Sequence, residues 1–109
     1  MEEIVKNLSG IWYLATSEND QPHVRAFDKA AVINDKLYIG TAKNKKVFQQ
    51  IVANPKVEIY ALTDFGPCRF MAEAYAADDT ISEEAFLKMG KIYDPATSVA
   101  LELRNIQKY

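Results

Sequence analysis

Residues 36–59 read KLYIGTAKNKKVFQQIVANPKVEI, and the spacing of apolar residues changes twice along this stretch. Residues 37–41 are rich in strand formers and predict a strand. Residues 44–53 change to the period of a helix, which ends at Asn54-Pro55, and residues 57–62 predict another strand. The apolar face of the helix would carry Val47, Phe48, Ile51 and Val52, and its polar face Lys45, Lys46, Gln49 and Gln50.

Further short strands lie on both sides of this unit. Residues 10–17 predict a strand, and after a turn residues 23–33 predict a second one, with a bulge near Lys29. A tight turn at residues 34–36 makes this second strand and residues 37–41 a hairpin. Downstream, strands are expected at residues 68–76 and from Ser98 to Leu103 or beyond.

Two more helices are expected, at residues 2–8 and after residue 80. The sequence Thr80-Ile81-Ser82-Glu83 has the pattern of a capping box and would open a helix that runs to about Met89. Many short strands joined by hairpins, with a few helices, predict a mainly β (α+β) fold: a small barrel with helices packed around it.

Composition limits the class of protein. A length of 109 residues fits a single domain over 1–109. The formal net charge of -2 differs from the basic charge that is typical of nucleic-acid-binding domains. No apolar run approaches the roughly 20 residues that span a bilayer. The acidic, amphipathic start is unlike a signal peptide. A single cysteine, Cys68, cannot form an internal disulfide, which favours a reducing cytoplasm.

Several kinds of catalytic site lack support in the sequence. One histidine, His23, and one cysteine are too few for a zinc site within one chain, so no metal site is expected. The glycine patterns of Rossmann and P-loop nucleotide sites are absent. The paired carboxylates lie at or just before expected helix starts, where acids are favoured anyway. No catalytic residue can be named, and this fits either a protein whose cofactor does the difficult chemistry or a non-catalytic binder.

The helix expected at residues 44–53 breaks the usual rule of helix electrostatics. Acids are favoured at helix N-termini, yet Lys43, Lys45 and Lys46 gather at this one with no acid nearby in sequence. Free backbone N–H groups, the positive end of the helix dipole and lysine cations together predict a phosphate site. Gly40 would allow close backbone approach, and Thr41 would add a hydroxyl donor. The alternative is a solvated lysine face.

A second basic residue is a candidate for the same anion. The two-residue period of a strand places His23, Arg25 and Phe27 on one face, with Val24 and Ala26 on the other. The planar guanidinium of arginine suits phosphate, and its strand would form a hairpin with the strand that leads to the lysines. The alternative is an arginine on the outer surface of the barrel.

The order of several segments resembles the pyridoxamine 5′-phosphate oxidase-like flavin-binding family. The resemblance is close over residues 11–62 and looser through residues 69–74. It is carried by Tyr13–Thr16, Gln21–Phe27, Lys36–Thr41, Lys45–Ile51 and Asn54–Ile59. Departures from the family pattern are Ala26, where proline is common, and Ala72-Glu73, where serine-glycine is common.

The resemblance implies a six-stranded antiparallel split barrel that forms a homodimer with FMN at the subunit interface. The strand Arg25–Asp28 would lie along the flavin ring, and its arginine would help to hold the phosphate. The segment from Thr41 to Lys46 would bind the phosphate and the ribityl chain. The cofactor-binding residues expected are therefore Arg25, Ala26, Phe27, Asp28, Thr41, Ala42, Lys45 and Lys46.

The resemblance leaves the activity open. One hypothesis is an FMN-dependent oxidoreductase that passes electrons from a nicotinamide donor to a small acceptor. The others are a non-catalytic flavin carrier or sensor, a haem-binding protein with His23 as axial ligand, and a scaffold that has lost its cofactor. The short chain lacks the C-terminal substrate residues of the larger oxidases, which argues against oxidation of pyridoxamine phosphate itself.

Overall fold

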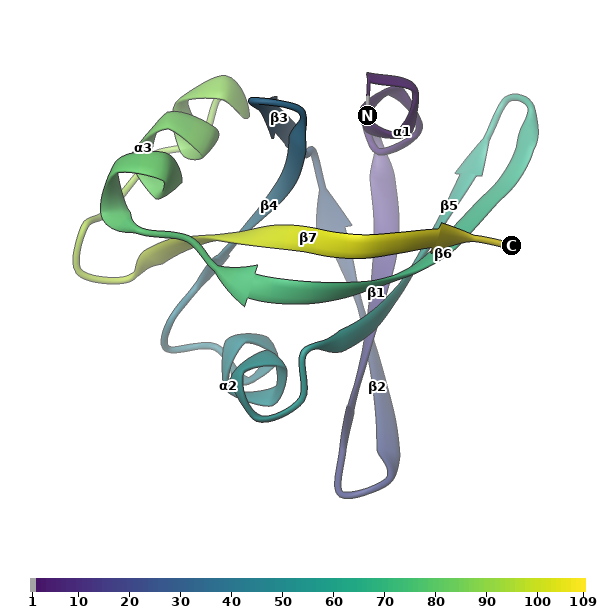
Figure 1. Ribbon diagram of the computed structural model, residues 1–109, viewed down its shortest axis with the longest axis horizontal. Helices are drawn as coiled ribbons and strands as arrows, with labels where there is room; N and C mark the ends of the chain where they lie inside the picture. Colours follow the sequence, from purple (N-terminus) through teal and green to yellow (C-terminus); the bar gives the residue numbers. More distant parts are fainter. Residues whose placement is uncertain (1) are drawn as a thin grey trace.

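The computed structural model describes residues 2–109, and most of its elements are strands (Figure 1). In chain order the elements are α1 (Glu2–Asn7), β1 (Ile11–Glu18), β2 (Gln21–Asp28), β3 (Ala31–Ile33), β4 (Lys36–Ala42), α2 (Lys46–Ala53), β5 (Lys56–Thr63), β6 (Gly66–Ala76), α3 (Asp79–Lys88) and β7 (Ser98–Lys108). The predicted mainly β architecture with peripheral helices is confirmed. None of the helices within residues 2–109 is long and apolar enough to cross a membrane.

The strands form one antiparallel sheet in the order β2-β1-β5-β6-β7-β4-β3. Its two edge strands, β2 and β3, are consecutive in the chain and are joined by only Lys29 and Ala30. The sheet must therefore curl until its edges approach each other, which gives a barrel that is split rather than closed by hydrogen bonds. β7 lies between β6 and β4, so it connects the four strands on one side to the two on the other.

The sheet has seven strands because the strand expected at residues 23–33 breaks in two. Lys29 has a φ of 62°, in the left-handed region, and this turns the chain from one edge of the sheet to the other. β2 then pairs with β1, while β3 pairs with β4 through the expected tight turn at Asn34-Asp35. The break replaces the expected bulge near Lys29.

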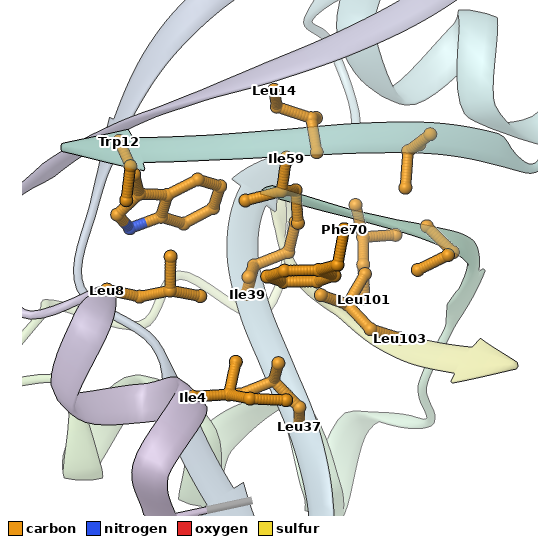
Figure 2. Close-up of a cluster of buried hydrophobic side chains, with 14 of the residues drawn as sticks. Ile4, Leu8, Trp12, Leu14, Leu37, Ile39, Ile59, Phe70, Leu101 and Leu103 are labelled. Atoms are coloured by element: carbon orange, nitrogen blue, oxygen red, sulfur yellow. The ribbon is translucent and has the colours of Figure 1, made fainter. Parts of the chain in front are cut away.

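The barrel interior is filled by one apolar cluster (Figure 2). Side chains from five strands and from the segment at α1 point toward one another there, and they include Ile4, Leu8, Trp12, Leu14, Leu37, Ile39, Ile59, Phe70, Leu101 and Leu103. Alternation of buried and exposed residues along β1 and β5 places Trp12 and Leu14 of β1 and every second residue of Val57–Ala61 in this cluster. The cluster holds the strands that carry the candidate site in fixed positions.

A second, smaller cluster lies under α3, where Phe86 and Met89 pack against β4 at Gly40. A Cβ atom at Gly40 would lie 3.1 Å from carbons of both side chains. Close packing of α3 therefore explains the glycine at this position. Its expected role, close approach of the backbone to a phosphate, stays a prediction.

The helix α3 begins at a different cap from the one expected. Asp78 is the N-cap residue, and its side chain accepts a hydrogen bond of 2.9 Å from the backbone N–H of Ile81. The capping box at residues 80–83 is therefore wrong: Ser82 lies inside the helix, buried, and its hydroxyl accepts a hydrogen bond from the backbone N–H of Ala100 at 3.0 Å. This bond ties α3 to β7.

Candidate anion site at β2 and α2

The guanidinium of Arg25 is the centre of a buried polar network between β2, β1 and α2. Arg25 Nη1 donates to the Thr16 hydroxyl at 2.8 Å, and Nη2 donates to Gln50 Oε1 at 2.7 Å. The Thr16 hydroxyl donates to the same Gln50 oxygen at 2.6 Å. Thr16 and Gln50 are each only 3% exposed, while Arg25 is half-buried. The predicted two-residue period of β2 is confirmed, because Arg25 faces inward with His23 and Phe27.

This arrangement gives Arg25 neutral partners and no direct carboxylate partner among residues 2–109. Two longer bonds of 3.4 Å run from Nη1 to the backbone oxygens of Leu14 and His23. Glu18 touches the network only through Gln50, whose Nε2 donates to its carboxylate at 3.4 Å. Desolvation by burial lowers the pKa of Arg25, which remains a cation at any physiological pH. A partly desolvated cation without a direct counter-ion favours the approach of an anion.

The burial of Gln50 corrects the expected faces of α2. The structure buries Val47, Gln50 and Ile51, at the i, i+3 and i+4 positions of one helical face, and leaves Val52 exposed. Gln50 is buried because Thr16 and Arg25 satisfy its side-chain oxygen. Thr16 and Gln50 are the site residues that the sequence analysis missed. The spacing of Gln50 from Val47 and Ile51 was the available signal for its burial.

The start of α2 has the electrostatic character that the sequence predicted. Lys45 is the N-cap residue in an extended conformation, no side chain caps the helix, and no acid lies in its first turn. Lys43, Lys45 and Lys46 are all exposed. The helix begins at Lys46, two residues later than expected. Residues four apart lie on one helix face, so Lys46 lies on the Gln50 face, about 6 Å nearer the N-terminus.

Thr41 and Ala42 position the start of α2. Both are partly buried at the end of β4, where they pair with Val99 and Ser98 of β7. The backbone N–H of Lys43 then donates to the Thr97 oxygen at 2.7 Å. The β4–α2 connection is thus fixed by the beginning of β7. The structure brings Arg25 to α2 as expected, although the recorded contact is at Gln50, one turn beyond Lys46.

The other expected residues of β2 have separate environments. Phe27 stacks on Trp12 with ring centroids 5.1 Å apart, whereas Ala26 is exposed beside Tyr13 on the outer face. Asp28 is exposed and forms an ion pair of 2.7 Å with Lys91, which lowers the pKa of Asp28, mainly through the hydrogen bond. β2 is an edge strand, so one side of its backbone is free of sheet hydrogen bonds.

Two grooves of about 430 Å³ each lie away from most of these residues. One lies over β1, β5, β6 and β7, and of the network it includes only Thr16. The other lies beside the β5–β6 hairpin and includes Lys6, Arg69 and Lys108. The described residues hold no group of three or more His, Cys, Asp or Glu side chains placed to bind a metal ion.

Three solved structures illustrate the fold that this chain shares with known proteins. A NimC/NimA family protein from Clostridium acetobutylicum is 31% identical, with a TM-score of 0.81, over 94% of this chain and 81% of the other. A candidate pyridoxamine 5′-phosphate oxidase from Listeria innocua is 18% identical, with a TM-score of 0.68, over 98% and 95% of the two chains. An FAD-binding protein from Mesorhizobium loti is 16% identical, with a TM-score of 0.66, over 94% and 86%.

Comparisons by sequence alone gave no match, either to a family model or to a curated protein. The identification depends on the structure, where the NimC/NimA protein is both similar in fold and above 30% identical over nearly the whole chain. The candidate oxidase has the same architecture at lower identity. The chain belongs to the pyridoxamine 5′-phosphate oxidase-like split-barrel family.

Proposed function

We propose that the protein binds FMN and is an FMN-dependent oxidoreductase that passes electrons from a nicotinamide donor to a small acceptor. The observation that carries the proposal is the half-buried Arg25 guanidinium, which neutral partners hold. One of these partners, Gln50, lies on the same face of α2 as Lys46. A phosphate monoester supplies the negative charge that this position favours. Lys45 and the uncapped N–H groups at the start of α2 add to the attraction.

The edge of β2 suits the flavin ring. Residues 25–28 belong to a strand that pairs on one side only, so its backbone has free donors and acceptors for the polar edge of the ring. Thr41 and Ala42 lie at the end of β4, which leads to the lysines and suits contact with the ribityl chain. The FAD-binding protein with the same fold is consistent with a flavin ligand.

A homodimer would complete the site. Exposed apolar side chains on the outer face of β2, β1, β5 and β6 include Val24, Ile11, Tyr13, Tyr60, Leu62 and Met71. Tyr13 pairs directly with Tyr60 and, on its other side, with Ala26, so part of this surface is continuous across three strands. A large exposed apolar patch is typical of a protein interface. A second copy there would supply the other wall of a flavin cleft next to β2.

The protein side chains would bind and orient the cofactor rather than exchange protons with a substrate. Bound FMN supplies the two-electron transfer between donor and acceptor. A flavin carrier or sensor would use the same residues without turnover. A steady-state assay with a reduced nicotinamide nucleotide distinguishes these two functions. A cytoplasmic location is part of the proposal, because it keeps the half-buried Cys68 thiol reduced.

The test is retention of FMN by the purified protein after excess FMN is added and removed by desalting. We expect the wild type to keep the visible flavin bands. The K45E/K46E variant should bind FMN at least about 100-fold more weakly, because two attractions to the phosphate become repulsions. The variant K36E/K108E makes the same charge change at two exposed lysines on other elements, and it should bind as the wild type does.

Two results would count against the proposal. A wild-type protein that is colourless after FMN loading and desalting does not bind FMN as proposed. Equal FMN affinity in the wild type and in folded K45E/K46E would instead show that the phosphate lies elsewhere. Circular dichroism of each variant establishes that the fold is intact.

A further inference from the structure

The Arg25 network divides the guanidinium into an occupied edge and an open edge. The Thr16 hydroxyl and Gln50 Oε1 accept from the two Nη atoms and are hydrogen-bonded to each other, so together they occupy the terminal edge. A guanidinium has five N–H donors in a planar fork. Within residues 2–109 the Nε–H group has no recorded acceptor, and the neighbouring Nη2 has one acceptor for its two protons. These two donors form the lateral edge of the fork, which can bind an anion in bidentate fashion.

Whether residue 50 is neutral or anionic determines how much of the positive charge of Arg25 is available at the open edge. A glutamate has nearly the same shape as glutamine and would reach the same Nη2 atom, but it would neutralise the guanidinium. The amide oxygen of Gln50 orients the group equally well and leaves its charge intact. Gln50 also separates Arg25 from the exposed Glu18 carboxylate, which contacts the Nε2 side of the amide.

We propose that Gln50 is a positioning residue that determines specificity: it fixes Arg25 through a neutral acceptor, so that the site selects phosphorylated flavin over riboflavin. The Thr16 hydroxyl on β1, which accepts from Nη1, helps to fix the guanidinium in the same way. This inference rests on the proposed function, and it names the ligand class at that site as a flavin with a phosphate monoester. A purely structural Gln50 would support both ligands equally.

The experiment compares the dissociation constants of FMN and riboflavin for the wild type and two variants. In Q50E, FMN should bind about 10- to 100-fold more weakly while riboflavin binding is unchanged, so the preference for FMN is largely lost. In Q49E the same charge is added to the exposed neighbouring position, and the preference should stay. R25Q should also lose the preference, and adding Q50E to R25Q should cause no further loss.

Two other outcomes of this experiment overturn the inference, and two more require a second measurement. Unchanged FMN preference in folded Q50E overturns it, and so does a wild type that binds FMN and riboflavin equally. If the wild type binds neither flavin, or if Q50E does not fold, inorganic phosphate is titrated into ¹⁵N-labelled wild-type protein instead. The inference then requires the Arg25 Nε–H resonance to shift on saturation while the Gln50 amide signals persist. An unmoved Arg25 resonance contradicts it.

Discussion

Substitution of Gly40 by alanine tests whether this residue serves packing or ligand binding. The new Cβ atom would lie 3.1 Å from Met89 Cε and from Cε1 and Cζ of Phe86, where ordinary contacts are 3.4–4 Å. Both side chains are at most 5% exposed, so they have little room to move. Overpacking of this kind costs about 1–3 kcal/mol. Alanine recovers about 0.5–1 kcal/mol because it restricts the unfolded chain.

The net expectation for G40A is a loss of about 1 kcal/mol in the free energy of unfolding, the middle of a range of about 0–2.5 kcal/mol. For a domain of this size a loss of about 1 kcal/mol lowers the Tm by about 4–6 °C. Urea denaturation and thermal scans measure both quantities. The control is G10A, since a Cβ atom at Gly10 would meet nothing within 4 Å. FMN affinity of folded G40A should stay within about twofold of the wild type. Unchanged stability together with weakened FMN binding would refute the packing argument.

Three further predictions concern the cap of α3, one ion pair and the outer face. D78A should lower the free energy of unfolding by about 1 kcal/mol, whereas T80A should change it little, because Asp78 is the N-cap. The pKa of Asp28 is lower in the folded state, so the ion pair with Lys91 stabilises above the unfolded pKa of about 4 and loses this effect as the pH falls. The difference in urea midpoint between wild type and D28N should therefore shrink from pH 6 to pH 3. Y60R should shift the molar mass in light scattering from dimer to monomer, and a monomeric wild type would contradict the proposed dimer.

The local sequence predicted the elements well because period and turn chemistry act locally. The hairpin at Asn34-Asp35 and the lysine-rich start of α2 are both confirmed. The cap of α3 was misplaced because Asp78 and Thr80 are both good N-cap residues. The packing of Ser82 under β7 favours the earlier start.

The missed features depend on contacts between distant residues. Gln50 is buried because of Arg25 and Thr16, which lie 25 and 34 residues away in sequence. From the sequence, a glutamine side chain near lysines on a helix is expected to be exposed to solvent. The burial of Gln50 follows only from its contacts in the folded chain. The sequence indicated a bulge near Lys29, but it did not indicate the positive φ that ends β2 there. It follows from the need to place β2 and β3 at opposite edges of the sheet.

The central place of β7 has a consequence for how the protein folds as it is made on the ribosome. Hairpins such as β1–β2 and β5–β6 pair strands that are neighbours in sequence, so they can form early. The strand β4 pairs with β3 on one side, but its partner on the other side is β7, about 60 residues later in the chain. Until β7 leaves the exit tunnel, the nascent chain holds two separate β-layers with open edges. The nascent domain is thus most exposed to aggregation and to chaperones just before β7 emerges.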